Sequence, residues 1–252
     1  MGLDILKHME YTDERGYTVH HISIKQEDKI SIFQLLDQHI LHIHQGKTDR
    51  YTAKYVKGKL KNFIDKQTFN NKKGAVAEIF THLLLKLLYF EQRCCFKNLE
   101  ENSMKKGFDG VYMQDNEIWF MESKSTESIR HHLNINIAIK DITEKITKYA
   151  SNDPWANALV HAERLDSEAK LKDKLEALSI GFSEGIYPNF SDFNIIPSST
   201  VYRGSNFCQQ EPFDIDEVQK RHDEIWANNH LIVCCTHDLL SLFDEYLEWG
   251  ED

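Results

Sequence analysis

Residues 107–124 read Gly-Phe-Asp-Gly-Val-Tyr-Met-Gln-Asp-Asn-Glu-Ile-Trp-Phe-Met-Glu-Ser-Lys, and this stretch decides the fold. Its apolar beginning predicts one strand, residues 114–117 predict a polar turn, and residues 118–124 predict a second strand rich in aromatic and branched residues. Two strands folded back on this turn form an antiparallel hairpin. A register centred on the turn places Asp109 beside Glu122. We therefore expect two carboxylates to meet at the open end of the hairpin.

The second strand ends in a pair of charges. Side chains alternate between the two faces of a sheet, so Glu122 and Lys124 project from one face, together with Phe120, while Ser123 projects from the other. Buried charge is costly unless it is paired or bound to a metal, so a functional explanation is indicated. The alternative is a surface salt bridge, since Glu-x-Lys in a strand is common by itself.

This arrangement predicts a magnesium site and a hydrolytic centre. Two carboxylates, Asp109 and Glu122, with the backbone carbonyl of Ser123, suit octahedral Mg²⁺, and we expect Mn²⁺ to substitute. Such a metal polarises a phosphate oxygen and eases the deprotonation of water. Lys124 would orient that water or offset the developing charge.

The hairpin is preceded by the clearest helical pattern in the chain, over residues 75–89. Glu78 interrupts its apolar side, and His82 follows one turn later, so the two can share a face. We take Glu78 as a fourth catalytic candidate beside Asp109, Glu122 and Lys124. The alternative is a glutamate that faces solvent.

The rest of the chain predicts a single α/β (α+β) domain over residues 1–252. Strands are expected over residues 17–24, 192–203 and 231–235, and loops at Pro188 and Pro197. Helices are expected over residues 52–66, 135–150, 155–178, 215–228 and 238–248, and residues 29–44 predict a helix followed by a short strand.

Composition narrows the class of protein. The chain has 252 residues, a formal net charge of -10 and five cysteines, which lack a C-x-x-C spacing and do not predict a zinc site. We expect reduced thiols, a cytoplasmic location and no membrane contact, since the longest apolar run is too short to span a bilayer and no secretory signal opens the chain. No phosphate loop predicts a nucleotide cofactor. His39, His42 and His44 would share a metal only with other ligands, so we interpret them as ordinary histidines, the last two on a strand.

A run of lysines opposes the acidic net charge. Between residues 54 and 73 a single acid, Asp65, is outnumbered by lysines, whereas residues 211–224 and 244–252 are acidic. Local charge governs docking, so we predict that this run contacts nucleic-acid phosphates. The alternative is a solvated helix face. The candidate DNA-binding residues are Lys54, Lys57, Lys59, Lys61, Lys72 and Lys73.

The motifs resemble the PD-(D/E)XK nuclease superfamily over about residues 72–150, with Phe108 in place of the motif's proline. The stretch Lys-Gly-Phe-Asp-Gly-Val-Tyr and the late strand Leu-Ile-Val-Cys-Cys resemble more narrowly the HamA family, nuclease subunits of the Hachiman antiphage system. The resemblance implies a restriction-endonuclease-like core with a mixed sheet flanked by helices, an N-terminal extension over residues 1–71, and C-terminal strands and helices over residues 151–252.

The same resemblance implies a function. It is that of a Mg²⁺-dependent DNA endonuclease, the effector of an antiviral defence system, restrained by the helicase subunit HamB. Two alternatives remain open: a non-catalytic nucleic-acid- or protein-binding module, and an RNA-directed nuclease. The last helix, with Leu239, Leu240, Phe243, Tyr246 and Leu247, offers a partner an apolar face or completes the core.

Overall fold

The computed structural model describes most of the chain. The described residues are 2–12, 17–24, 28–46, 51–96, 107–127, 130–148, 152–202, 217–218, 231–236 and 239–250, with side chains at 232–236 excepted.

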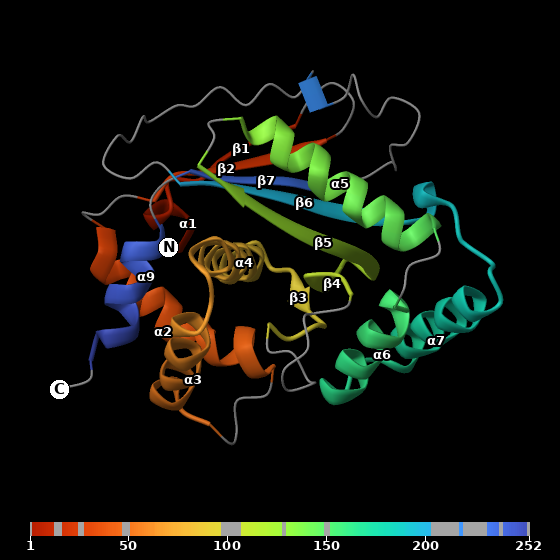
Figure 1. Ribbon diagram of the computed structural model, residues 1–252, viewed down its shortest axis with the longest axis horizontal. Helices are drawn as coiled ribbons and strands as arrows, with labels where there is room; N and C mark the ends of the chain where they lie inside the picture. The colour runs from red at the N-terminus through yellow and green to blue at the C-terminus, as the bar shows by residue number, and fades with distance from the viewer. Residues whose placement is uncertain are drawn as a thin grey trace.

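The described strands form one mixed sheet of seven strands in the order β1-β2-β7-β6-β5-β4-β3 (Figure 1). The pairs β2–β7, β7–β6 and β6–β5 are parallel, and the pairs at both edges are antiparallel. The predicted mixed α/β fold is confirmed. The strands are β1 (Met9–Thr12), β2 (Thr18–Ile22), β3 (Glu91–Gln92), β4 (Gly110–Gln114), β5 (Glu117–Thr126), β6 (Asn194–Val201) and β7 (Leu231–Thr236).

Helices cover both faces of the sheet (Figure 1). One face packs against α5 (His131–Thr147), and residues of α6 (Pro154–Arg164), α7 (Ala169–Ser183) and the short η2 (Phe190–Asp192) belong to the same apolar cluster. The other packs against α4 (Phe69–Leu87), which is covered in turn by α1, α2, α3 and α9. Their bounds are Gly2–Ile5 for α1, Lys29–Gln45 for α2, Ala53–Asp65 for α3 and Leu239–Glu248 for α9.

The β4–β5 hairpin adopts the predicted register. Asp115 and Asn116 form the two-residue turn with φ of 51° and 64°, the left-handed conformation that short hairpin turns need and that Asn and Asp tolerate. Gly110 faces Met121 across the hairpin, so one step further out Asp109 reaches the level of Glu122. Gly110 is also required sterically, because an added Cβ would lie 2.6 Å from the Tyr112 ring.

Two helical segments differ from the prediction. Residues 29–45 form one helix with no strand after it, because Leu36, Ile40 and Ile43 are buried at helical spacing. The expected helix over residues 155–178 is two helices, α6 and α7, because Asp166 adopts a positive φ of 56° between them.

Helix α4 begins earlier than the pattern predicted, at Phe69, where the Thr68 side chain accepts a hydrogen bond from the Asn71 backbone N–H. Gly74 therefore lies inside the helix instead of opening it. Helix α5 likewise begins at His131, ahead of the predicted residue 135.

A loop was predicted at Pro197, but this residue lies inside β6, opposite Glu122. The pairing of β6 with β7 starts only at the next residue, so proline's missing N–H falls where that ladder has not begun. Pro188 does lie in a loop. The predicted helix over residues 215–228 lies outside the described residues, apart from helical 217–218.

Helix α9 completes the core. Its residues Leu239, Phe243, Tyr246 and Leu247 are all at most 2% exposed and pack in the same cluster as α4 and α2. Of the two readings of this helix, partner face or core element, the structure supports the core element.

Candidate active site

The carboxylate of Glu122 lies under α5 between two ammonium groups. Glu122 is 4% exposed. Its Oε1 accepts a hydrogen bond from Lys124 Nζ at 2.9 Å, and its Oε2 accepts one from Lys145 Nζ at 2.5 Å. Glu122 and Lys124 thus occupy one face of the sheet, as the alternation predicted.

Helix α5 contributes two residues that the sequence analysis missed, Asp141 and Lys145. Asp141 lies 2.7 Å from Lys124 Nζ, and Lys145 pairs with Glu122. The two are four residues apart, so they face β5 from successive turns. The sequence did carry a signal for these two residues: an acid and a base four residues apart on the helix that follows the Glu-x-Lys strand. The four residues Glu122, Lys124, Asp141 and Lys145 are called the β5–α5 cluster below.

Lys124 remains an ammonium in this environment. Burial by itself lowers its pKa, but the charge of Glu122, hydrogen bonds to Asp141 and Glu122, and the charge of Asp109 outweigh burial and raise the pKa above its ordinary value. A lysine with a raised pKa keeps its charge throughout the neutral range. Lys124 can therefore offset negative charge.

Asp109 lies at the open end of the hairpin. Its Oδ2 accepts a hydrogen bond from the backbone N–H of Ser123 at 2.8 Å. The side chain thus continues the ladder between the two strands just beyond Gly110. Asp109 also contributes to the raised pKa of Lys124, so its charge is felt within the β5–α5 cluster. The predicted neighbourhood of Asp109 and residues 122–124 is present.

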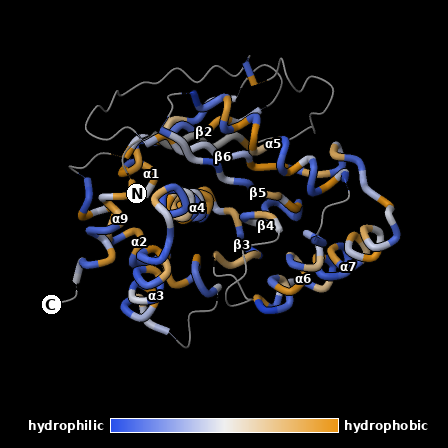
Figure 2. Tube along the Cα trace, viewed as in Figure 1, coloured by the Kyte–Doolittle hydropathy of each residue, from blue (hydrophilic) through white to orange (hydrophobic). Residues whose placement is uncertain are grey.

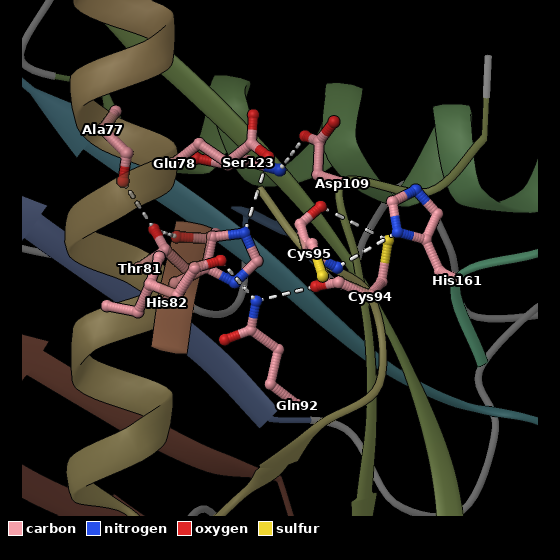
Figure 3. A network of polar contacts seen from close by, with 12 residues as sticks. Ala77, Glu78, Thr81, His82, Gln92, Cys94, Cys95, Asp109, Ser123 and His161 are labelled. Carbon is pink, nitrogen blue, oxygen red and sulfur yellow. Dashed lines mark hydrogen bonds and ion pairs between the residues drawn. The ribbon is translucent and has the colours of Figure 1, made fainter. Parts of the chain in front are cut away.

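Glu78 lies on the opposite face, on α4. Its Oε1 is 3.5 Å from His82 Nε2, so the two residues share a face as predicted. His82 Nδ1 in turn contacts the buried Tyr112 hydroxyl. Burial, together with the charges of Cys94, Glu78 and Asp109, raises the pKa of Tyr112. Figure 3 shows Glu78 beside Ser123 and Asp109, at the open end of the hairpin.

The oxygen donors fit a hard cation in kind. Asp109, Glu122 and the Ser123 carbonyl are the ligand types that Mg²⁺ takes. In the described part of the chain, however, Glu78, Asp109 and Glu122 do not form a three-ligand group within 4.8 Å. Lys145 occupies the Glu122 oxygen that is not bonded to Lys124, as a positive ion would. Metal binding at Glu122 would therefore compete with Lys145.

The predicted DNA-binding lysines fall into two groups. Lys54 and Lys59 are exposed and Lys72 is partly exposed. Lys57, Lys61 and Lys73 instead pair with Asp37, Glu248 and Glu127, at 2.7, 3.2 and 2.9 Å respectively. Lys57 and Lys73 are also buried, which leaves little ammonium surface for a phosphate. Helix α3 remains largely hydrophilic (Figure 2).

The three histidines that lie near one another in the sequence are on a helix. His39, His42 and His44 lie on α2, not on a strand, and only His44 of the three is buried. Burial, followed by the charge of Lys86, lowers the pKa of both His39 and His42. Cys94 and Cys95 are buried and do not form disulfides. Among the described helices, none has both the length and the apolar character needed to cross a membrane.

A mixed sheet covered by helices on both faces, with an acid–lysine cluster at the end of its hairpin, defines a mixed α/β protein with a nuclease-like core. The HamA family model matches residues 4–240, nearly the whole chain. The chain therefore belongs to the HamA family, and this membership supports a role in antiphage defence. A search of curated proteins found no match.

Proposed function

We propose that the protein is a Mg²⁺-dependent DNA endonuclease that hydrolyses phosphodiester bonds as the effector of the Hachiman system. The observation that carries the proposal is the β5–α5 cluster. Glu122 is nearly fully buried yet bonded to two ammonium groups, with a second acid, Asp109, at a strand end nearby. Apolar residues of similar size at these positions would stabilise the fold at least as well, so a buried ion cluster is better explained by chemistry.

Each residue then has a role. Asp109, Glu122 and the Ser123 carbonyl would hold the metal, which supplies a Lewis acid and a more acidic water. Lys124, held protonated, would stabilise the charge that builds on the phosphate oxygens as water attacks and the P–O bond breaks. Asp141 orients the Lys124 ammonium.

Glu78 takes an indirect role in this proposal. Because it lies on the α4 face, we infer that it positions the hairpin through His82 and Tyr112.

The DNA backbone would lie along the exposed lysines. Lys54, Lys59 and Lys72 have ammonium groups available to phosphates, whereas Lys57 and Lys73 support packing. Acidic residues of α9 adjoin this surface: Lys61 pairs with Glu248, and the Lys61 and Lys72 charges both act on Asp244.

A helicase partner, HamB, would restrain the nuclease until DNA is sensed. Family membership supports the partnership. The apolar side of α9 is not its docking surface, since those residues are buried. Co-expression with the helicase, then size-exclusion chromatography and cleavage assays, tests this step. Separate elution with unchanged cleavage would contradict the restraint.

A direct assay distinguishes the candidate functions. The purified protein is incubated with plasmid DNA or RNA, with Mg²⁺ or EDTA, beside the Lys124→Ala variant. We expect Mg²⁺-dependent cleavage of DNA that EDTA and the substitution both remove. Cleavage of RNA alone would assign an RNA-directed nuclease. Binding of DNA without cleavage, alone or with the partner, would assign the non-catalytic module.

A further inference from the structure

A second group of side chains that can bind a metal lies at the β1–β2 edge of the sheet, away from the β5–α5 cluster. His8, Glu10 and His20 gather where β1 and β2 form the sheet edge, and β7 and β6 separate β2 from β5. Within the described residues, this is the group of three in which one ligand atom from each lies within 4.8 Å of the others. The proposed nuclease chemistry does not use it.

The local fold places all three residues on one side of the β1–β2 ribbon. Glu10 and His20 are direct partners in the antiparallel register. His8 immediately precedes β1 and is two residues from Glu10, so its side chain points the same way. His20 is 4% exposed, whereas the Glu10 side chain is 52% exposed. The group therefore has a buried member, His20, and a member open to solvent, Glu10.

The two imidazole rings turn nitrogen atoms toward each other. His8 Nε2 lies 2.7 Å from His20 Nδ1, and the ring centroids are 4.9 Å apart with an interplanar angle of 16°. Glu10 Oε2 lies 3.5 Å from the same His20 nitrogen. Three potential ligand atoms thus converge from three side chains.

These distances suit a tetrahedral ion. Zinc bonds to His nitrogen and carboxylate oxygen at about 2.0–2.2 Å, which separates tetrahedral ligand atoms by roughly 3.3 Å. The observed 2.7 and 3.5 Å separations lie on either side of that value, so small side-chain rotations suffice. Two imidazoles and one carboxylate favour zinc-class ions, whereas Mg²⁺ prefers oxygen ligands. The fourth position faces solvent and would take water.

We propose that His8, Glu10 and His20 bind a divalent zinc-class ion that fastens the edge strand β1 to β2. All four residues of β1 are exposed, and β1 has β2 as its neighbour in the sheet. Because β1 buries so little surface, it is held mainly by its backbone hydrogen bonds to β2, and a metal ion bound by both segments would stabilise it directly. The described cysteines, Cys94 and Cys95, are not members of this group.

The test is a calorimetric titration of the full-length, EDTA-treated protein with ZnCl₂, in excess Mg²⁺ to occupy oxygen-ligand sites. Wild type is compared with His8→Ala and Glu10→Gln. His39→Ala removes a half-buried histidine elsewhere and is the matched control. Glu122→Ala separates this site from the proposed nuclease site.

We expect one zinc equivalent to bind wild type, His39→Ala and Glu122→Ala alike. His8→Ala should bind at least about 100-fold more weakly, since even loss of an outer-shell partner typically costs 10–100-fold. Zinc should also raise the melting temperature of wild type and leave that of His8→Ala unchanged. Equal zinc affinity in wild type and His8→Ala, or loss only in Glu122→Ala, would overturn the proposal, whatever the outcome of the nuclease assay.

Discussion

Two lysines of this protein lie in similar pairs but in very different surroundings. Lys57 Nζ is 2.7 Å from Asp37, and Lys124 Nζ is 2.7 Å from Asp141. Lys57 also donates to the Trp249 carbonyl and lies 4.4 Å from the centre of the Tyr246 ring. Lys124 instead shares Glu122 with a second ammonium, that of Lys145.

We infer from this difference that the charge of Lys57 stabilises the fold, whereas the charge of Lys124 serves the proposed reaction. Lys57 pairs with Asp37 of α2, which also accepts a hydrogen bond from Tyr246 of α9, and aromatic rings close the site, so the Lys57 side chain is only 7% exposed. Around Lys124, which is 25% exposed, the charges belong to a four-residue cluster of two acids and two ammonium groups. An identical first contact therefore does not indicate an identical role, and the predictions below test this.

The largest effect is expected from Lys124→Ala on cleavage. Loss of an ammonium that offsets transition-state charge should lower the cleavage rate about a thousandfold. Glu122 keeps Lys145 as its partner, so the fold should persist. Initial rates on plasmid DNA, with circular dichroism for the fold, measure both. Lys57→Ala, at matched concentration, should cleave at nearly the wild-type rate. Equal losses in the two variants would remove the distinction.

Lys57→Ala should show the complementary effect, on stability. The substitution removes the cation–π contacts of α3 with Tyr246 and Trp249 and its ion pair with Asp37 of α2, at a cost of about 2–3 kcal/mol. Urea unfolding measures the free energy of unfolding, with Lys59→Ala on the same helix as the exposed control. A change no larger than that of the control would mean that Lys57 is not a structural lysine.

Lys145→Met should alter the Mg²⁺ requirement. Because Lys145 occupies Glu122 Oε2, its removal should lower the Mg²⁺ concentration for half-maximal cleavage by about fivefold, the scale of a partly exposed ion pair. Lys140→Met, on an exposed position of the same helix, should leave that concentration unchanged. A higher Mg²⁺ requirement in Lys145→Met would show that Lys145 assists the site instead of competing for it.

The smallest effect concerns the exposed lysines near Lys57. Changing Lys54, Lys59 and Lys72 together to Gln should make the slope of log DNA affinity against log salt concentration less steep. The expected change is up to about 0.9 for each phosphate that these lysines neutralise. Fluorescence anisotropy at several salt concentrations gives the slope. The control changes Lys170, Lys172 and Lys174, on α7, and alters net charge equally. The same slope for both triple variants would support the alternative interpretation, in which the lysine run is a solvated helix face.

The hairpin could be predicted from the sequence because its determinants are local. The Asp115–Asn116 turn fixes the register, and alternation then places Glu122 and Lys124 on one face. Asp141 and Lys145 could not be assigned this way. Their place opposite β5 depends on how α5 docks, which periodicity does not determine.

Other errors have the same origin in tertiary context. The predicted strand after residue 40 was favoured by Ile and His residues, yet burial against α4 keeps the segment helical. Pro197 reads as a loop residue because strands usually exclude proline, and only the partial ladder of β6 explains it. Amphipathicity alone also left two readings of α9, since core and docking helices share that pattern.

The pairing of β2 with β7 has a consequence for how the protein is made. Strand β2 lies near the start of the chain, and its partner β7 follows roughly two hundred residues later. While the chain is being translated, the Glu-Ser-Lys strand emerges long before β6 and β7 can join it. The sheet that supports the proposed site can close only after most of the chain has left the ribosome. An incomplete polypeptide therefore lacks the completed sheet, and if the proposed nuclease activity holds, synthesis itself delays the first moment at which the chain could damage the DNA of its own cell.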